Sequence, residues 1–361
     1  MRILVLNNYS FTRVLNEVEC KLKPAHHLYG LNIIKERGHE LIILEKNTSS
    51  FIYKLFNFLA KIPLCNFGDV ELQIRAILKS NQYDLIYAPC QDCTPLLGIL
   101  SYFKFFNKPI IAIAHHPFLV GRLTFFKKIG LYFSLNGHFA YPALSAVIAN
   151  QINSVVKKDL SFELFWGPDI QYYNSLVEKK PTVENKFDIV SIGRTGRDYN
   201  TLISAFVNTS VRVGIFCNKS LKEVIQKNIT DNILIHWLNS DEELDYEKVV
   251  DIYRASNIIA VPMFEQNSLC GLTSVTDAIA LCIPIIATKN KYLNIDVESE
   301  QIGIWAEPYN TKDWVLAHLN IQDSETFKIN LSKNNWQAVQ YKYNHEQFSN
   351  QIIDIINKID K

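Results

Sequence analysis

The residues best suited to bind an anion lie in two short stretches of the sequence. In the first stretch, Ser-Ile-Gly-Arg-Thr-Gly-Arg, Gly193 and Gly196 permit a tight turn directly after an apolar run. Arg194 and Arg197 carry guanidinium groups that match phosphate oxygens. The N-terminus of a following helix would add backbone donors. The stretch therefore predicts a phosphate site; the alternative is an ordinary strand-to-helix loop with two solvated arginines.

The second stretch, Gly-Leu-Thr-Ser-Val-Thr-Asp, begins at Gly271. If a helix starts there, its free amides and the hydroxyls of Thr273 and Ser274 would face the same anion as Arg197. Asp277, one turn further on, could accept hydrogen bonds from sugar hydroxyls. The alternatives are that the two hydroxyls only cap the helix and that Asp277 only favours its first turns.

Two pairs of histidines form a third candidate. His115 and His116 end an apolar run, where a neutral imidazole could donate a hydrogen bond to a sugar hydroxyl. His26 and His27 lie at the corresponding edge of an earlier unit and could meet the same substrate. One histidine of the first pair is expected to be structural. The cysteines and carboxylates nearby have no convincing metal-ligand spacing, so we expect no metal site.

A Cys-x-x-Cys pair, Cys90 and Cys93, lies at a predicted strand-to-helix junction, where redox proteins carry a reactive dithiol. A thioredoxin-like protein would leave most of the chain unexplained, so we predict that both are small packing residues. The seven cysteines are odd in number and scattered, which fits a reducing cytoplasm better than a disulfide framework.

Two segments, residues 51–63 and 118–133, mix aromatic and aliphatic residues with lysine and arginine and contain no acidic residue. They could rest on an anionic membrane surface, or they could be core segments with exposed lysines. The net charge is +1, but residues 1–165 contain 18 Lys+Arg against 11 Asp+Glu. This basic first half favours the membrane contact, and no nucleic-acid partner is expected.

Predicted strands and helices, which would position these residues, alternate along the chain. This alternation is typical of parallel sheets covered by helices on both faces. Strands are predicted at 2–8, 39–45, 83–89, 108–116, 144–150, 187–193, 211–217, 232–238, 257–263 and 284–288. Helices are predicted at 24–38, from about 94, at 121–135, at 199–208 and at 343–359. This order predicts two doubly wound domains with a ligand cleft between them.

The length of 361 residues also favours two domains. We expect an N-terminal domain at 1–165, a polar, proline-bearing linker at 166–186, a second domain at 187–340 and a C-terminal helix at 341–361. The first apolar run is too short for a signal peptide, and no segment resembles a membrane-spanning helix. A cytoplasmic protein is expected, and a location at the inner face of the membrane is left open.

In this order the segments resemble the retaining GT-B glycosyltransferases, of the large family 4-like group of bacterial polysaccharide and lipid glycosyltransferases. The resemblance spans nearly the whole chain. It rests on these segments: LYGLNIIKERGHELIIL, AIAH, LSAVIAN, SIGRTGRDYNTLISAF, YRASNIIAVPM, GLTSVTDAIALCIPIIAT and GIWAEPYNTKDW. It implies two Rossmann-like domains facing across a cleft, an N-terminal acceptor domain, a C-terminal nucleotide-sugar domain, and a last helix packed back on the first domain.

The resemblance also implies roles for single residues. His115 would contact the transferred sugar, while Arg194 and Arg197 of the loop after Gly193 would neutralise the donor diphosphate. The donor would also meet Gly271, Leu272, Thr273 and Ser274, with Asp277 facing the ribose. Trp237 falls near the base-binding edge, although a core position is the alternative. His26, His27 and His116 would face the acceptor.

One departure concerns the acidic residues of the family, which has two glutamates separated by seven residues. Asp277 stands at the second position, and the spacing from Gly271 puts Ser268 at the first, with Leu269 beside it. Glu265 is the nearest acid that could substitute.

The expected reaction moves a hexosyl group from a nucleotide-diphosphate sugar to a glycan or lipid-linked hydroxyl, with retention of anomeric configuration. The sequence has no Asp-x-Asp element for a divalent cation, so neither metal nor other cofactor is expected beside the nucleotide-sugar co-substrate. A nicotinamide cofactor is not expected either, because a third glycine at the dinucleotide spacing is absent. The alternatives are a GT-B nucleotide-sugar epimerase and a non-catalytic sugar-nucleotide or polysaccharide-binding relative.

Overall fold

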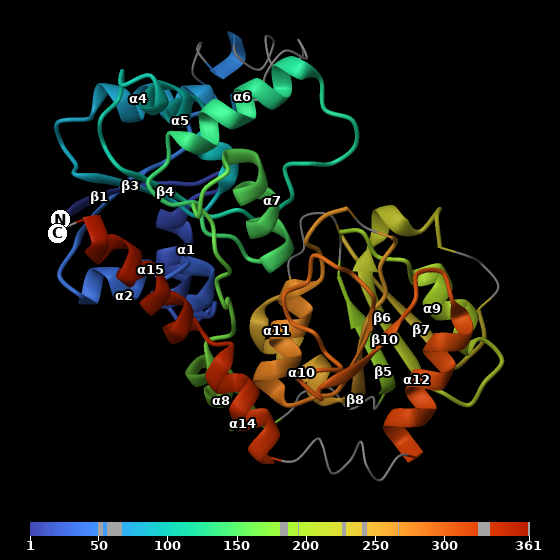
Figure 1. Ribbon diagram of the computed structural model, residues 1–361. Coiled ribbons are helices and arrows are strands. Elements are labelled where there is room, and N and C mark those ends of the chain that lie inside the picture. Colours follow the sequence, from blue (N-terminus) through green and yellow to red (C-terminus); the bar gives the residue numbers. More distant parts are fainter. Residues whose placement is uncertain are drawn as a thin grey trace. The chain divides into compact units, whose positions relative to one another are not determined.

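The chain forms two compact α/β units in the computed structural model (Figure 1). Unit 1 contains Met1–Cys20, Ala25–Trp166 and His345–Lys361, and unit 2 contains Lys21–Pro24 and Gly167–Asn344. The structure describes residues 1–49, 53–55, 67–180, 187–193, 195–225, 229–239, 244–265, 267–323 and 333–359.

Unit 1 is built on a parallel sheet with the strand order β2-β1-β3-β4. Its strands are β1 (Arg2–Leu6), β2 (Glu40–Leu44), β3 (Leu85–Ala88) and β4 (Ile110–Ala112). Val5 in the central strand pairs with Ile43 on one side and Tyr87 on the other. β3 and β4 are buried along their whole length, which explains their continuous apolar sequences.

The helices of unit 1 lie on the two faces of this sheet. They are α1 (Phe11–Glu19), η1 (Ala25–Leu28), α2 (Leu31–Glu36), α4 (Val70–Leu78), η2 (Gln91–Cys93), α5 (Pro95–Tyr102), α6 (Phe125–Asn136), α7 (Ala146–Val156) and α15 (His345–Ile359). The terminal helix α15 contacts α2 and buries Phe348, Ile352 and Ile356. The predicted return of the last helix to the first domain is therefore confirmed.

The predicted strand at 144–150 is wrong, because this segment begins helix α7. Ile148, Ile152 and Val156 recur every four residues and are all buried, which is helical spacing. The β-branched residues of the segment suggested a strand. The residues that pair with the sheet lie just before the segment 144–150. Ala140 forms a single parallel bridge with Ile111, and Ala143 forms one with Ala114.

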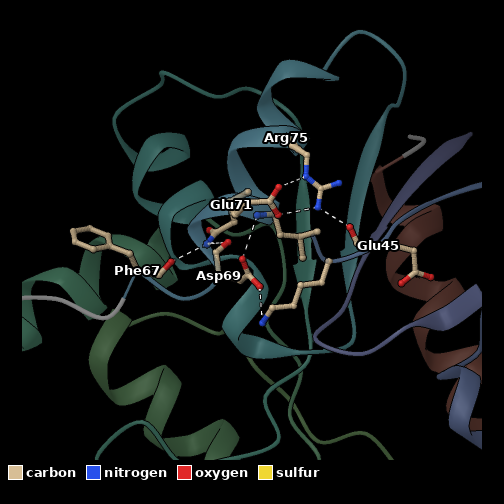
Figure 2. Close-up of polar contacts among 8 residues, drawn as sticks. Glu45, Phe67, Asp69, Glu71 and Arg75 are labelled. Carbon is tan, nitrogen blue, oxygen red and sulfur yellow. Dashed lines mark hydrogen bonds and ion pairs between the residues drawn. The ribbon is translucent and has the colours of Figure 1, made fainter. Parts of the chain in front are cut away.

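Helix α4 is anchored to the segment after β2 by charged side chains (Figure 2). Arg75 donates from Nε to Glu71 Oε1 at 2.6 Å and from Nη2 to the Glu45 carbonyl at 2.6 Å. At the other end of the helix, Asp69 caps the N-terminus by accepting from Leu72 N at 3.2 Å. These contacts fix the segment that precedes α4. Helix α4 itself contacts the residues after β3.

Unit 2 contains a six-stranded parallel sheet with the order β10-β9-β8-β5-β6-β7. Its strands are β5 (Phe187–Ile192), β6 (Val213–Asn218), β7 (Ile233–Leu238), β8 (Ser256–Val261), β9 (Ile285–Thr288) and β10 (Gly303–Ala306). Counted within the unit, this is the doubly wound order 3-2-1-4-5-6, which reverses between β5 and β8. Ligands of such sheets bind outside the carboxyl ends of the strands at that reversal.

The helices of unit 2 cover both faces of its sheet. They are α8 (Ile170–Val177), α9 (Tyr199–Phe206), η3 (Lys219–Leu221), α10 (Tyr246–Arg254), α11 (Leu272–Leu281), α12 (Thr311–Asp323) and α14 (Lys333–Lys342). Helices α9 and α12 pack together on one face around Trp314 and Phe206, while α10 and α11 lie on the other (Figure 1).

The segment predicted as a linker contains helix α8, which the sequence analysis did not anticipate. Asp169 caps it by accepting from Tyr172 N at 3.1 Å, and Tyr173 and Leu176 are buried on one side. Only eight residues long, the helix gives too few turns for its apolar periodicity to stand out. Residues 181–186 of the predicted linker lie outside the described residues.

Candidate functional site

Arg197 is fixed at the reversal point of the unit 2 sheet by the backbone. It forms an antiparallel bridge with Met263, which follows β8, while the loop that contains Arg197 follows β5. Next to it, Asp198 N donates to the Pro262 carbonyl at 3.1 Å, and Asp198 caps α9 through Thr201 N at 3.1 Å. The two loops whose strands flank the reversal are thus joined to each other.

The guanidinium of Arg197 is buried without a carboxylate partner in the described part of the chain. The residue is 8% exposed. Nη2 donates to Ser274 Oγ at 2.9 Å, and Nη1 lies 3.0 Å from Met263 Sδ. Nε has no hydrogen-bond partner among the described residues. Asp277 interacts electrostatically with this charge, but no ion pair joins the two side chains in the described part of the chain. A buried cation bound directly by only a hydroxyl and a thioether could be neutralised by a bound anion.

Two glycines allow the backbone to approach this guanidinium. A Cβ on Gly193 would lie 2.3 Å from Arg197 Nε. A Cβ on Gly271, whose φ is +87°, would lie 2.9 Å from Val261 Cγ1 and 3.1 Å from Met263 Sδ. A side chain at Gly193 would therefore displace the guanidinium of Arg197, and at Gly271 the positive φ disfavours any residue but glycine as well.

Helix α11 begins at Leu272, and Gly271 is its N-cap residue, as the sequence predicted. No side chain of the described residues caps the helix, so its first-turn amides are available as donors. Ser274 is buried against Arg197, whereas Thr273 is exposed. The structure therefore brings Ser274 and Arg197 together and leaves Thr273 at the surface.

Asp277 lies inside unit 2, 8% exposed, and accepts a hydrogen bond from the hydroxyl of Tyr173 in α8. Burial raises the pKa of Asp277 to about 7, although the Tyr173 hydrogen bond and the charge of Arg197 both act to lower it. Burial, together with the nearby Asp277, also holds the pKa of Tyr173 well above its ordinary value. The carboxyl group thus links α11 to α8, a contact that the sequence did not indicate.

The other residues predicted for the donor site lie in varied surroundings. Arg194 falls outside the described residues. Trp237, on the edge strand β7, is half-buried and packs against the core of unit 2, as the alternative interpretation expected. Ser268 Oγ lies 3.2 Å from Cys270 Sγ, and Glu265 is exposed, with its amide donating to Tyr309 Oη at 3.3 Å.

In unit 1, His115 follows β4 and is held as a neutral imidazole. Its Nε2 lies 2.5 Å from the carbonyl of Pro89, which can only accept, so Nε2 carries the proton and Nδ1 is the acceptor. Burial lowers the pKa of His115 to about 4. The backbone amides of His115 and His116 both donate to Gln91 Oε1 at 2.8 Å.

An aromatic cluster in unit 1 joins His115 to the earlier histidine pair. The ring of Tyr29 lies 5.3 Å from His115 and 6.0 Å from Trp166, and Trp166 lies 5.1 Å from His26. His26 and His27 are 4.4 Å apart, and burial holds the pKa of His26 well below its ordinary value. Three of the four predicted histidines are thus brought together.

Sequence reasoning missed the residues that position these groups: Tyr29, Gln91, Trp166, Tyr173 and Met263. Gln91 carried a usable signal, because it follows a buried apolar run where the strands of a parallel sheet end. His116, the fourth predicted histidine, is exposed, 6.5 Å from His115.

Neither a metal cluster nor a membrane-spanning helix is found in the described parts of the chain. No three His, Cys, Asp or Glu residues there are grouped so that they could hold a metal ion. None of the helices there has the length and apolar character needed to cross a bilayer.

Two helix-covered parallel sheets of these strand orders define the class of the protein: it has the GT-B fold. Among solved structures of that fold, the chain is similar to Anabaena HepE in complex with UDP and glucose (TM-score 0.64, 14% identity, 99% of this chain and 100% of that one). It is also similar to sucrose-phosphate synthase from Thermosynechococcus elongatus (0.70, 15%, 99% of each chain). A third similar structure is described as a UDP-N-acetylglucosamine 2-epimerase from Listeria monocytogenes (0.58, 11%, 99% and 95%).

Sequence comparison gives a shorter match. D-inositol 3-phosphate glycosyltransferases of Rhodococcus jostii and Rhodococcus opacus are 32% identical to the chain over 71 residues. The match covers 20% of this chain and 15% of those enzymes. No model of a known protein family matches the sequence.

Proposed function

We propose that the protein is a glycosyltransferase that moves a hexosyl group from a UDP sugar to a hydroxyl of a glycan or lipid-linked acceptor. The observation that carries the proposal is the buried guanidinium of Arg197 at the reversal of the unit 2 sheet, with no carboxylate partner among the described residues. The diphosphate of the donor would supply the missing negative charge. UDP is favoured as the nucleotide because HepE, which shares the fold, was solved with UDP and with UDP-glucose.

The protein would promote transfer by stabilising the negative charge that develops on the donor phosphate. As the bond between sugar and diphosphate breaks, negative charge builds on the leaving phosphate. Arg197 and the uncapped amides of α11 would stabilise that charge without needing a divalent cation. Arg194 would act with them. With retention of configuration, the departing phosphate would take the acceptor proton on the same face of the sugar.

His115 would orient the transferred sugar. Because Nε2 donates to Pro89, Nδ1 would accept a hydrogen bond from a sugar hydroxyl, and the low pKa keeps it unprotonated at neutral pH. This reverses the direction expected from the sequence, in which the imidazole was the donor. His26, His27 and His116 would face the acceptor.

The acceptor side would rest on an anionic membrane, at the inner face if the acceptor is lipid-linked. No Asp or Glu occurs from residue 93 to residue 158, while Phe105 is 81% exposed and Phe125 71% exposed in that stretch. Lys104 and Lys128 are exposed beside them. Exposed aromatic rings among cations suit a surface of anionic headgroups. The other segment predicted for this contact, 51–63, lies mostly outside the described residues.

The test is to incubate the protein with radiolabelled UDP-glucose, GDP-mannose and related donors, with and without lipid extract and a chelator. Transfer or donor hydrolysis that survives chelation is expected. Arg197→Ala should abolish turnover, and Arg197→Lys should retain a fraction, because it keeps the charge but not the planar fork. Arg212→Ala, at an exposed site of the same unit, is the matched control. Binding without turnover across the panel would contradict the proposal.

An epimerase is the second candidate, because the fold is shared with the Listeria protein described as an epimerase. Proton transfer at the sugar ring needs an acid and a base, and the described acids of this site suit it poorly. Asp277 is already hydrogen-bonded to Tyr173, and Glu265 is exposed. Deuterium incorporated into the sugar from heavy water, without transfer to an acceptor, would identify an epimerase instead.

A further inference from the structure

The two residues of the Cys-x-x-Cys pair lie at the ends of one tight turn after β3. Cys93 N donates to the Cys90 carbonyl at 3.2 Å, which closes the turn and holds the two residues close together. A turn of this kind holds its end Cα atoms within about 7 Å. A disulfide bridges Cα atoms in that range, so the two sulphurs could be joined with little movement of the backbone.

The surroundings of Cys90 favour its thiolate. Interactions with the Cys93 thiol and with the backbone of Asp92 and Asn8 lower the pKa of Cys90. The Cys93 thiol is the main cause that holds the pKa of Cys90 below its ordinary value, against burial and the nearby carboxylate of Asp92. Cys90 is partly exposed, whereas Cys93 is fully buried and its pKa is raised. A partly exposed thiol with a lowered pKa beside a buried partner is the arrangement of attacking and resolving cysteines.

The residue between the two cysteines is the one that holds the histidine turn. Gln91 Oε1 accepts from both His115 N and His116 N, and its carbonyl accepts from Tyr141 Oη at 3.3 Å. Any change in the dihedral angles of the turn therefore moves the side chain on which the backbone of His115 depends.

The opposite side of the turn is braced by α4 and its N-cap residue Asp69. The Asp92 carbonyl accepts from Asp69 N at 2.8 Å, and Asp69 is paired with Lys46 at 3.0 Å. Gln73 donates to the Phe67 carbonyl at 2.7 Å, and its Oε1 accepts from Leu96 N at 2.8 Å in the first turn of α5. Since these bonds fix the turn on the α4 side, a rearrangement is expected to be taken up on the histidine side.

We propose that Cys90 and Cys93, which the sequence suggested were packing residues, are instead a redox-active dithiol, and that its oxidation to an intramolecular disulfide shifts the Gln91 contact and displaces His115. The effect on catalysis rests on the proposed glycosyltransferase function; the dithiol itself does not.

The oxidant is a small disulfide such as oxidised glutathione. The Cys90 thiolate attacks one sulphur of glutathione disulfide, forming a mixed disulfide and releasing one glutathione thiolate, which takes up a proton. Cys93 then loses its proton, and its sulphur attacks Cys90 Sγ and releases the second glutathione. Two protein thiols are oxidised to one disulfide, and one disulfide is reduced to two thiols.

The test equilibrates the full chain in glutathione buffers of stepped redox ratio, quenches with acid and maps the cysteine peptides by mass spectrometry. The peptide that contains Cys90 and Cys93 is expected to lose two hydrogen atoms while the buried Cys217 stays reduced. Cys93→Ser should trap a mixed disulfide between Cys90 and glutathione. Cys90→Ser should leave the buried Cys93 unmodified. If the pair stays reduced in the most oxidising buffer, the dithiol assignment fails.

The coupling to His115 has its own readout. Oxidation should shift the ring resonances of His115 in the NMR spectrum, lower transfer several-fold and be reversed by dithiothreitol. Cys20→Ser, at an exposed cysteine in α1's C-cap position, should leave the response unchanged. A disulfide that forms without moving the His115 resonances would overturn the coupling. A disulfide that moves them in a protein without transferase activity would instead contradict the proposed function.

Discussion

Arg197 Nη2 donates to Ser274 Oγ at 2.9 Å, and this one hydrogen bond joins the loop after β5 to the first turn of α11. The two residues are 77 positions apart in the sequence. Their contact brings a fixed cation to the uncapped start of a helix, so both could act on the same anion.

Ser274→Ala is expected to lower the free energy of unfolding of unit 2 by about 1–3 kcal/mol, because it leaves a buried charged donor without its acceptor. UDP affinity should fall as well, since the guanidinium loses its anchor. Urea unfolding and UDP titration measure the two effects. Thr273→Ala, at the exposed neighbouring position, is the control and should change stability by less than about 0.5 kcal/mol. Equal effects of the two substitutions would show that the contact with Arg197 is unimportant.

Gly271→Ala should be more destabilising than Gly38→Ala. Both glycines have almost the same φ, +87° and +88°, so alanine meets the same backbone strain of about 1–2 kcal/mol at each. Only at Gly271 would the new Cβ also press on Val261 and Met263; nothing lies within 4 Å of it at Gly38. Comparing the thermal unfolding of the two variants separates the cost of backbone strain, which both share, from the cost of the Cβ contacts, which only Gly271→Ala makes. A loss of UDP binding in Gly271→Ala alone is also expected, because the start of α11 would shift.

Asp277 should make the protein less stable as the pH rises from about 4 to about 7. Its pKa is raised from 3.8 to about 7 by burial, so the folded state binds a proton that the unfolded state has released over this range. The stabilisation is complete below pH 4 and is lost as the pH passes 7. A shift of this size corresponds to a free energy on the order of 4 kcal/mol. Urea unfolding between pH 4 and pH 8 measures the slope.

Asp277→Asn is the control for this dependence of stability on pH. Its amide oxygen can still accept the hydrogen bond from Tyr173, but the amide cannot titrate. Its stability should vary less over the same pH range. Tyr173→Phe should move the loss of stability to higher pH, because the hydrogen bond that lowers the pKa of Asp277 is removed. A wild-type slope that survives Asp277→Asn would assign the pH dependence to another group.

His115 should remain neutral until the pH approaches 4. Burial lowers the pKa of His115 from 6.5 to about 4 in the folded state. As the pH falls from about 6.5 to 4, the unfolded state therefore takes up a proton that the folded state does not, and the contribution of His115 to stability is lost. A ring titration by NMR measures the pKa and should also report the proton on Nε2, hydrogen-bonded to Pro89. Titration near pH 6.5, or a proton on Nδ1, would contradict the tautomer on which the sugar contact depends.

The strands could be predicted because parallel strands buried on both faces have continuous apolar sequences. The run from Val213 to Cys217 is an example, since all five residues are buried. Helix α7 could not be separated from a strand on the same grounds, because Val147 and Ile148 are β-branched and the spacing that marks a helix becomes visible only over eleven residues.

The donor-site residues could be predicted in part, because glycine, arginine and hydroxyl residues next to strand ends have few other uses. Arg197, Gly271 and Ser274 come together as the sequence suggested, although their role with a donor stays a prediction. The contact of Asp277 with Tyr173 could not be predicted, because it spans 104 positions and depends on a short helix. Strand order, which sets the reversal point, is likewise a property of tertiary packing.

The return of α15 to unit 1 has a consequence for synthesis on the ribosome. Phe348, Ile352 and Ile356 complete a core whose other residues are translated before unit 2. At about 5–20 residues per second, the segment 167–344 takes on the order of ten to forty seconds to emerge. During that interval the surface of α2 that α15 will cover stays open to chaperones and proteases.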